Sequence, residues 1–168
     1  MGVTNFDIIQ ANQFIGPGIG GGGSEADEAT TGRTFYVNNS TTAIPVGAIG
    51  GSNGNSGLTP LEPLATIRFA ISLCVANRGD KIVVMAGHSE TLAAVTTVNI
   101  SGITIQGEGR GTDRATVIVG YVGDGFNVTS DSVKIQNILF ATSTAAATAR
   151  INVAAADVVI DGCNFQCG

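Results

Sequence analysis

Short segments of alternating apolar and polar residues fill the chain from Arg33 onwards. Gly, Asn, Asp or Ser lie between these segments, which is typical of short strands joined by tight turns. The segments predicted as strands are residues 34–37, 81–85, 97–100, 103–106, 116–119, 126–129, 133–140, 150–153 and 157–165. The pattern therefore predicts an all-β domain.

One segment has a different spacing. Its apolar residues recur close to every 3.6 positions, which predicts an amphipathic helix at about residues 63–78. Pro63 lies near the predicted start and Gly79 just beyond the end, and both positions suit those residue types. The apolar stripe consists of Leu64, Ile67, Ala70, Ile71, Leu73 and Cys74.

An internal repeat gives the arrangement of the strands. Residues 127–140 align without gaps on residues 152–165, at an offset of 25. An earlier copy, residues 99–107, fits at a longer spacing. Repeats of about 20–50 residues indicate solenoids, in which each unit buries its apolar face against its neighbours. The coinciding apolar pairs are Val128/Val153, Val133/Val158, Ile135/Ile160 and Phe140/Phe165.

The first 34 residues differ from the rest. A short apolar stretch is followed by residues 16–23, which contain six glycines, and then by an acidic patch. We expect residues 1–34 to form an extended anchoring arm with a glycine-rich hinge, ahead of a domain at residues 35–168; a disordered tail is the alternative. The apolar residues predicted to bind a partner are Val3, Phe6, Ile8, Ile9, Phe14 and Ile15.

Composition narrows the function classes. The 24 glycines show no collagen period, and 43% hydrophobic residues argue against general disorder. A net charge of −5 with scattered basic residues argues against nucleic-acid binding. No apolar run reaches the roughly 18–20 residues of a membrane helix, and the N-terminus lacks the features of a signal peptide. Only 12% of the residues are charged, which fits an outer surface carried by Thr, Ser and Asn.

Three stretches resemble the opening of right-handed parallel β-helix (pectin-lyase-like) proteins: GNSGLTPLEPLATIRFAISLC, GDKIVVMAGHSET and GITIQGEG. In that resemblance residues 63–67 match a helix that caps the coil, residues 79–84 the first strand and residues 87–91 a turn. It covers about residues 35–168. It implies a short right-handed parallel β-helix with an N-terminal capping helix, a fold that serves lyases, hydrolases, tailspikes and virion proteins alike.

Candidate catalytic residues are limited to aspartates in the repeats. Asp131 and Asp157 occupy nearly equivalent turn positions, and Asp161 aligns with Gln136. A glycan lyase or hydrolase would bring these carboxylates together in a groove beside Arg110 or Lys134. Aspartates in turns more often make local hydrogen bonds, so we expect no catalytic site.

The remaining chemistry-bearing residues suggest no cofactor. His88 is the only histidine, and we expect it to be a turn residue. Cys163 and Cys167 lack a second ligand pair, so neither zinc nor another metal is expected. We expect the three cysteines to be buried or free thiols.

These features predict a non-enzymatic bacteriophage virion protein, assembled in the host cytoplasm. A coil ending near residue 168 has an uncovered last turn, so either the chain continues beyond that residue or another subunit or protein covers that end. The apolar arm also needs a surface to bind. We expect a homotrimeric capsid decoration (cement) protein that binds the major capsid protein or other virion subunits, with no nucleic-acid or membrane partner. The alternatives are a tail fibre or tailspike component, a polysaccharide lyase or hydrolase, and a carbohydrate-binding module.

Overall fold

The computed structural model describes residues 32–40, 44–144 and 148–166. The chain divides into two compact units, Met1–Thr31 and Gly32–Gly168, and the described residues all belong to the second. Residues 1–31 of the predicted arm, including all six of its apolar residues named above, lie outside the described part, and Thr34, placed at the end of the arm, begins a strand.

The described unit is mostly parallel β-sheet, which confirms the predicted all-β class. Its strands are β1 Thr34–Val37, β2 Lys81–Val84, β3 Ser89–Leu92, β4 Thr96–Val98, β5 Thr104–Gly107, β6 Thr116–Val119, β7 Phe126–Val128, β8 Lys134–Gln136, β9 Leu139–Thr142, β10 Ile151–Val153, β11 Val159–Asp161 and β12 Asn164–Phe165. They form three sheets, ordered β1-β2-β5-β8-β11, β3-β6-β9-β12 and β4-β7-β10. Every strand pair in these sheets is parallel.

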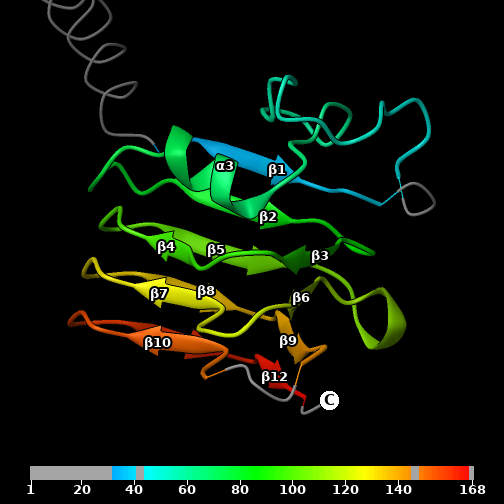
Figure 1. The fold of residues 1–168 in the computed structure, drawn as a ribbon. Helices are drawn as coiled ribbons and strands as arrows, with labels where there is room; N and C mark the ends of the chain where they lie inside the picture. Colours follow the sequence, from blue (N-terminus) through cyan, green and yellow to red (C-terminus); the bar gives the residue numbers. More distant parts are fainter. Residues whose placement is uncertain (1–31, 41–43, 145–147, 167–168) are drawn as a thin grey trace, which may run out of the picture. The chain divides into compact units, whose positions relative to one another are not determined.

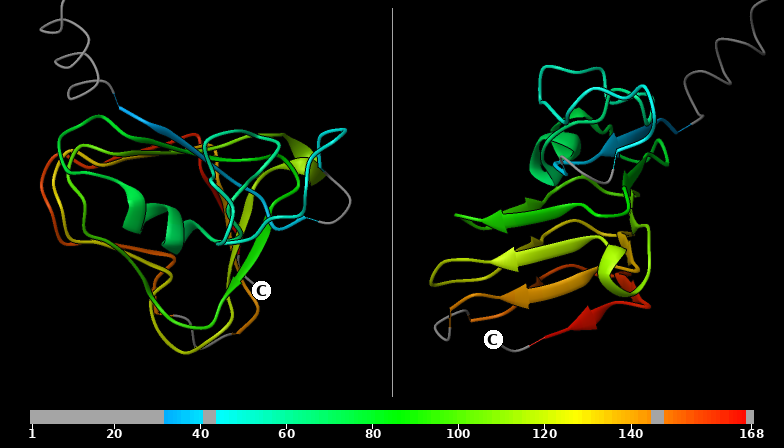
Figure 2. Two further views of the ribbon diagram at one scale, coloured as in Figure 1. Left: turned by 90° about the horizontal axis from the view of Figure 1, so that it is seen from above. Right: turned by 90° about the vertical axis from the view of Figure 1, so that its right-hand side faces the viewer.

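The chain visits the three sheets in a fixed order. From β2 onwards, each successive strand belongs to the next sheet, so that β2, β3 and β4 are followed by β5, β6 and β7. We call one such passage a coil. Successive coils lie over one another, as seen from the side in Figure 1 and from above in Figure 2.

The register follows the sequence repeat. Asn127 pairs with Asn152, Ile135 with Ile160 and Phe140 with Phe165, each pair 25 residues apart. The earlier copy also falls in register, because Ile105 pairs with Ile135. The offset read from the sequence is therefore the length of one coil in this part of the chain.

The inward side chains form ladders from coil to coil. Val128, Ile135 and Phe140 are fully buried. The ring of Phe126 meets that of Phe140 edge-on at 5.3 Å, and Phe165 stacks on Phe140 at 5.7 Å. Burial of each such side chain stabilises the fold by about 1.5–3 kcal/mol.

Three strand predictions need correction. Segments 133–140 and 157–165 were each predicted as one strand, but each contains two, because the chain turns at Asn137 and Gly162 with φ of 51° and 61°. Segment 87–91 was predicted as a turn, yet β3 begins at Ser89. Polar residues inside β3 concealed its strand character.

The helix α3 spans only Ile67–Leu73, whereas residues 63–78 were predicted. Thr66 is the N-cap, with its hydroxyl accepting from the Phe69 N–H at 3.3 Å. Beyond the helix, the Val75 N–H donates to the Asp80 carboxylate at 2.7 Å, which fixes the chain in a non-helical path. The helix still buries Ile67, Ala70 and Ile71. Among the described residues no helix is long and apolar enough to cross a membrane.

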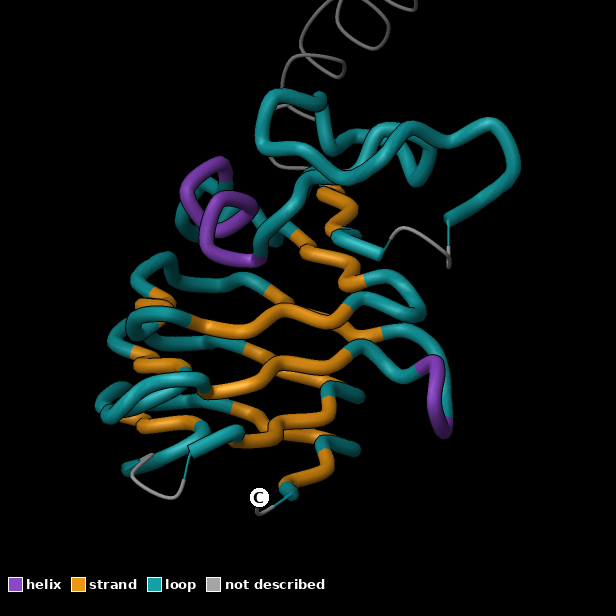
Figure 3. The backbone as a smooth tube through the Cα atoms, turned by 45° about the vertical axis from the view of Figure 1, so that its right-hand side comes forward, coloured by secondary structure: helices purple, strands orange, loops and turns teal. Residues whose placement is uncertain are grey.

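The helix and a long loop cover the first coil. Figure 3 shows the loop between β1 and α3 running beside the helix at one end of the stacked strands. The other edge of β1 is also occupied, because Tyr36 N–H donates to the Gly57 carbonyl at 2.7 Å and Leu64 N–H donates to the Tyr36 carbonyl at 2.8 Å. The outer edge of β1 is therefore occupied by the chain itself, and we call the helix together with this loop the cap.

Candidate functional site

The three candidate aspartates bind neighbouring coils. Asp131 Oδ1 accepts from the Ala156 N–H at 2.8 Å, and Asp157 Oδ2 accepts from the Ser132 hydroxyl at 3.0 Å. Asp161 Oδ2 accepts from the side-chain amide of Gln136 at 3.0 Å. All three aspartates are exposed.

The structure brings Asp131 and Asp157 into stacked turns, as their repeat positions predicted. Their hydrogen bonds connect one coil to the next across these turns. Asp161 lies on β11 at the position paired with Gln136, on the outward face of the first sheet. The carboxylates act as acceptors in coil-to-coil ladders, a structural use of the residues that a glycosidase would employ for acid–base chemistry.

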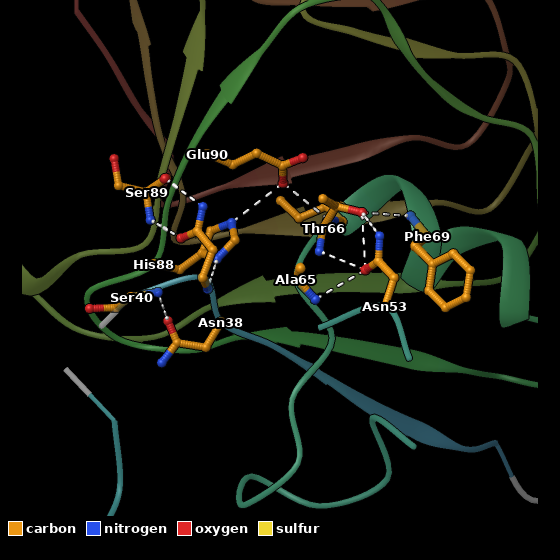
Figure 4. A network of polar contacts seen from close by, with 11 residues as sticks. Asn38, Ser40, Asn53, Ala65, Thr66, Phe69, His88, Ser89 and Glu90 are labelled. Carbon is orange, nitrogen blue, oxygen red and sulfur yellow. Dashed lines mark hydrogen bonds and ion pairs between the residues drawn. The ribbon is translucent and has the colours of Figure 1, made fainter. Parts of the chain in front are cut away.

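A buried polar cluster lies beneath the cap, around His88 and Glu90 (Figure 4). His88 is fully buried and directly precedes β3, and its Nδ1 accepts from the Asn39 N–H at 3.1 Å. That bond requires Nδ1 to lack a proton, so the neutral ring carries its hydrogen on Nε2. Nε2 lies 3.4 Å from Glu90 Oε2.

Glu90 connects this cluster to the helix. Its Oε2 accepts from the Ile67 N–H at 3.1 Å, at the first residue of α3. Asn39 adds a second connection, because its side chain accepts from the Ser89 N–H at 3.0 Å and donates to the Ser89 carbonyl at 2.7 Å. The cluster therefore fastens β1 and the helix to the first coil.

The same coil carries polar residues at inward positions that are apolar further along. Glu90 pairs with Val117, and Thr96 pairs with Phe126. Both Glu90 and Thr96 border a recess of about 230 Å³, together with Thr66 and Arg68. The Thr96 hydroxyl is buried without a hydrogen-bond partner among the described residues. None of the three candidate aspartates borders this recess.

A second buried carboxylate lies after the helix. Asp80 is fully buried and accepts four hydrogen bonds, all of 2.7 Å, from Arg33 N, Val75 N and the Nε and Nη2 atoms of Arg78. Burial alone would raise the pKa of Asp80, but the Arg78 hydrogen bond and the two backbone N–H groups hold it below its ordinary value of 3.8. This group organises the turn between α3 and β2.

Burial raises the pKa of both described thiols. Burial, followed by the charge of Asp80, raises the pKa of Cys74 to about 12. Burial also raises the pKa of the half-buried Cys163. Both are free, and Cys167 lies outside the described residues. Within residues 32–40, 44–144 and 148–166, no group of three or more His, Cys, Asp or Glu side chains is placed to hold a metal ion.

The last described coil lies at the opposite end of the sheets from the cap. The outermost strands there are β10, β11 and β12, and we call this surface the β10–β12 edge. Its inward residues Val153, Ile160 and Phe165 are 43%, 40% and 53% exposed, although their partners one coil above are fully buried. No described strand pairs with the free side of this edge. The sequence repeat is enough to identify these three positions, because each aligns with an inward apolar residue of the preceding coil and is the last such residue in its row.

Comparisons with known proteins add no relative: no family model, no curated protein and no solved structure matches this chain.

Proposed function

We propose that residues 35–168 form a short right-handed parallel β-helix capped by α3. Support comes from the fixed order in which the chain visits three parallel sheets and from the 25-residue register. Connections between parallel strands are right-handed in nearly all known cases, which supports the handedness. The helix buries Ile67, Ala70 and Ile71 next to the first coil, as a cap would.

On this fold, the proposed function is that of a non-enzymatic structural protein of a bacteriophage virion. The observation that carries the proposal is the use of Asp131, Asp157 and Asp161 as coil-to-coil acceptors. These carboxylates accept hydrogen bonds that join one coil to the next and so stabilise the stack of coils. An enzyme would instead need two carboxylates facing one substrate, one of them protonated as the acid.

Within the virion, the proposed role is capsid decoration. Residues 3–15 carry six large apolar side chains and are followed by a glycine-rich segment, a composition suited to binding across shell subunits. Apolar contact of this kind contributes about 25 cal/mol per Å² buried. A homotrimer would present three arms to the major capsid protein and bind as a multivalent unit. A tail fibre or tailspike component is the alternative within the same class.

Mass spectrometry of purified particles tests this function. Particles from the phage whose genome encodes the chain are separated on a density gradient and digested. The proposal expects peptides of this chain in the capsid fraction after tails are removed. Peptides confined to the tail fraction would favour the tail alternative, and their absence from particles would contradict the virion role.

A further inference from the structure

The recess next to the start of the helix lies where the interior of the first coil is polar. Glu90 and Thr96 border it, and one coil further along Val117 and Phe126 occupy the same two inward positions and are fully buried. Burying a polar group costs free energy unless the group finds a hydrogen-bond partner. Glu90 and Thr96 therefore call for partners that an apolar pair would not need.

Glu90 keeps one carboxylate oxygen for such a partner. Its Oε2 accepts from the Ile67 N–H at 3.1 Å and lies 3.4 Å from His88 Nε2, and Figure 4 shows both contacts meeting at this one oxygen. The other oxygen, Oε1, makes no hydrogen bond or ion pair among the described residues. The Glu90 side chain is 11% exposed and borders the recess, so Oε1 is its free, negatively charged acceptor there.

Arg68 brings the opposite charge to the same recess. Its Nη2 donates to the carbonyl of Ala94 at 3.1 Å and to that of Val95, which holds the guanidinium in place. Its Nε and Nη1 make no hydrogen bond among the described residues, and no ion pair there joins Arg68 to Glu90. The recess therefore offers one positive and one negative group that do not neutralise each other by direct contact.

The volume and lining of the recess limit the kind of ligand. The volume is about 230 Å³, below the roughly 300–1,000 Å³ of pockets that hold drug-sized ligands, so only a compact molecule fits. Thr96 is 1% exposed, and its hydroxyl, which has no partner among the described residues, is able to donate or to accept. The described part of the chain places no three His, Cys, Asp or Glu side chains together, so a divalent cation lacks its usual set of ligands.

We infer that this recess binds a small zwitterion, a free α-amino acid with a short side chain. The ammonium group of the ligand binds Glu90 Oε1 and the Thr96 hydroxyl, and its carboxylate binds the free N–H groups of Arg68. The short side chain lies against Ala93 and Ala94, which also border the recess. Each charged group of the ligand then meets an opposite charge, and such charge-assisted hydrogen bonds are the strong ones. The site belongs to the first coil and the helix, and it does not depend on the virion role.

Titration of the ¹⁵N-labelled full chain with L-alanine, followed through the amide chemical shifts, tests the site. Methylammonium and acetate each carry one of the two charged groups of alanine and serve as comparison ligands, and sodium chloride controls for ionic strength. We expect saturable shifts with alanine at the amides of residues 90–96. Methylammonium and acetate should each bind about tenfold more weakly or less, because each loses one charge-assisted contact.

Charge-matched variants locate the binding. Glu90→Gln and Arg68→Gln each remove one charge from the recess and should weaken alanine binding about tenfold. Glu108→Gln and Arg110→Gln make the same changes at exposed residues that do not border the recess, and they should leave the affinity unchanged.

Thr96→Val separates binding from folding. Valine has nearly the same shape and removes a buried hydroxyl that has no partner, so the urea midpoint should stay the same or rise while alanine binding weakens about threefold. Thr97→Val, at the exposed next position of β4, should leave the affinity unchanged.

Three results would overturn the site. They are the absence of saturable shifts with alanine, equal affinity for alanine and methylammonium, and equal losses in the recess variants and their exposed controls. If Glu90→Gln fails to fold by circular dichroism, Arg68→Gln and Thr96→Val carry the test, and wild-type affinity in both would contradict the proposed contacts.

Discussion

Gln136 donates its side-chain amide to Asp161 at 3.0 Å, and the two residues are paired in register, 25 positions apart on adjacent strands. The bond repeats a relationship already visible in the sequence alignment of the two repeats. It also shows how a surface with few charges is held together, since neutral donors meet carboxylates between coils.

The Phe ladder predicts a gradient of stability along the stack. Phe140→Ala should destabilise the protein by about 3–5 kcal/mol, because the ring is fully buried between two others. Phe165→Ala should cost clearly less, because that ring is 53% exposed. Urea unfolding of both variants measures the difference. Equal losses would mean that Phe165 is as well covered in solution as Phe140.

Asp80 predicts a specific dependence of stability on pH. Its folded pKa lies below its ordinary value of 3.8, so its contribution to folding is fully present above that value. The contribution is lost as the pH falls from there through the lowered folded pKa, because the unfolded chain takes up the proton first.

Asp80→Asn should therefore destabilise the protein at pH 7, by about 3 kcal/mol, and flatten the acid limb of the stability curve. Urea midpoints between pH 7 and pH 2.5 provide the measurement. The exposed Asp157→Asn serves as the control and should keep the wild-type curve near its original shape. An unchanged acid limb in Asp80→Asn would show that this carboxylate does not govern acid stability.

The hydrogen bond between Glu90 and the Ile67 N–H predicts that Glu90 helps to hold the helix against the first coil. Glu90→Ala leaves the buried Ile67 N–H without its acceptor and removes the carboxylate that lies 3.4 Å from His88 Nε2, at an expected cost of about 1–3 kcal/mol. The exposed neighbour Thr91→Ala should change stability little. Hydrogen exchange at the amides of α3 gives a local readout, and it should accelerate in Glu90→Ala alone. Unchanged exchange would place the anchoring of the helix elsewhere.

The burial and raised pKa values of the two described thiols predict the order in which they react with an alkylating reagent. Cys74, whose pKa is raised to about 12, should resist alkylation at pH 8 in the folded protein, because the thiolate is the reactive form. Cys163 should react faster than Cys74, because it is half-buried, and more slowly than a free thiol, because its pKa is also raised. Peptide-resolved mass spectrometry after timed alkylation measures both. Rapid labelling of Cys74 would contradict its burial.

The sequence predicted most of the strands because the repeat places apolar residues at the same inward positions in each coil. Ile135 and Ile160 are an example, being aligned in sequence and paired in space. The sequence pattern did not predict β3, because Glu90 places a polar residue at an inward position. Its carboxylate accepts a hydrogen bond from the Ile67 N–H at the start of the helix, which the pattern does not show. The pattern also overextended α3, because the end of the helix depends on Asp80, whose contact with Val75 has no sequence signature.

The candidate site was less predictable than the fold. The repeat places Asp131 near Asp157 but does not say which donors they meet. The partners are the Ala156 N–H and the Ser132 hydroxyl, each on the neighbouring coil. We predict that the wild-type protein does not turn over acidic polysaccharides, measured by release of reducing or unsaturated ends. Turnover that is present in the wild type and lost in Asp131→Asn would favour the enzyme.

The proposed anchoring of the chain to a phage shell is tested most directly by co-sedimentation with shells of the major capsid protein encoded by the same genome. The wild-type chain is compared with two triple variants. The apolar triple variant combines Phe6→Ser, Ile9→Ser and Phe14→Ser, and the polar control combines Asn5→Ser, Gln10→Ser and Asn12→Ser. We predict that the wild type and the polar control sediment with the shells and that the apolar triple variant stays in the supernatant. Equal sedimentation of all three proteins, or of none, would contradict the account.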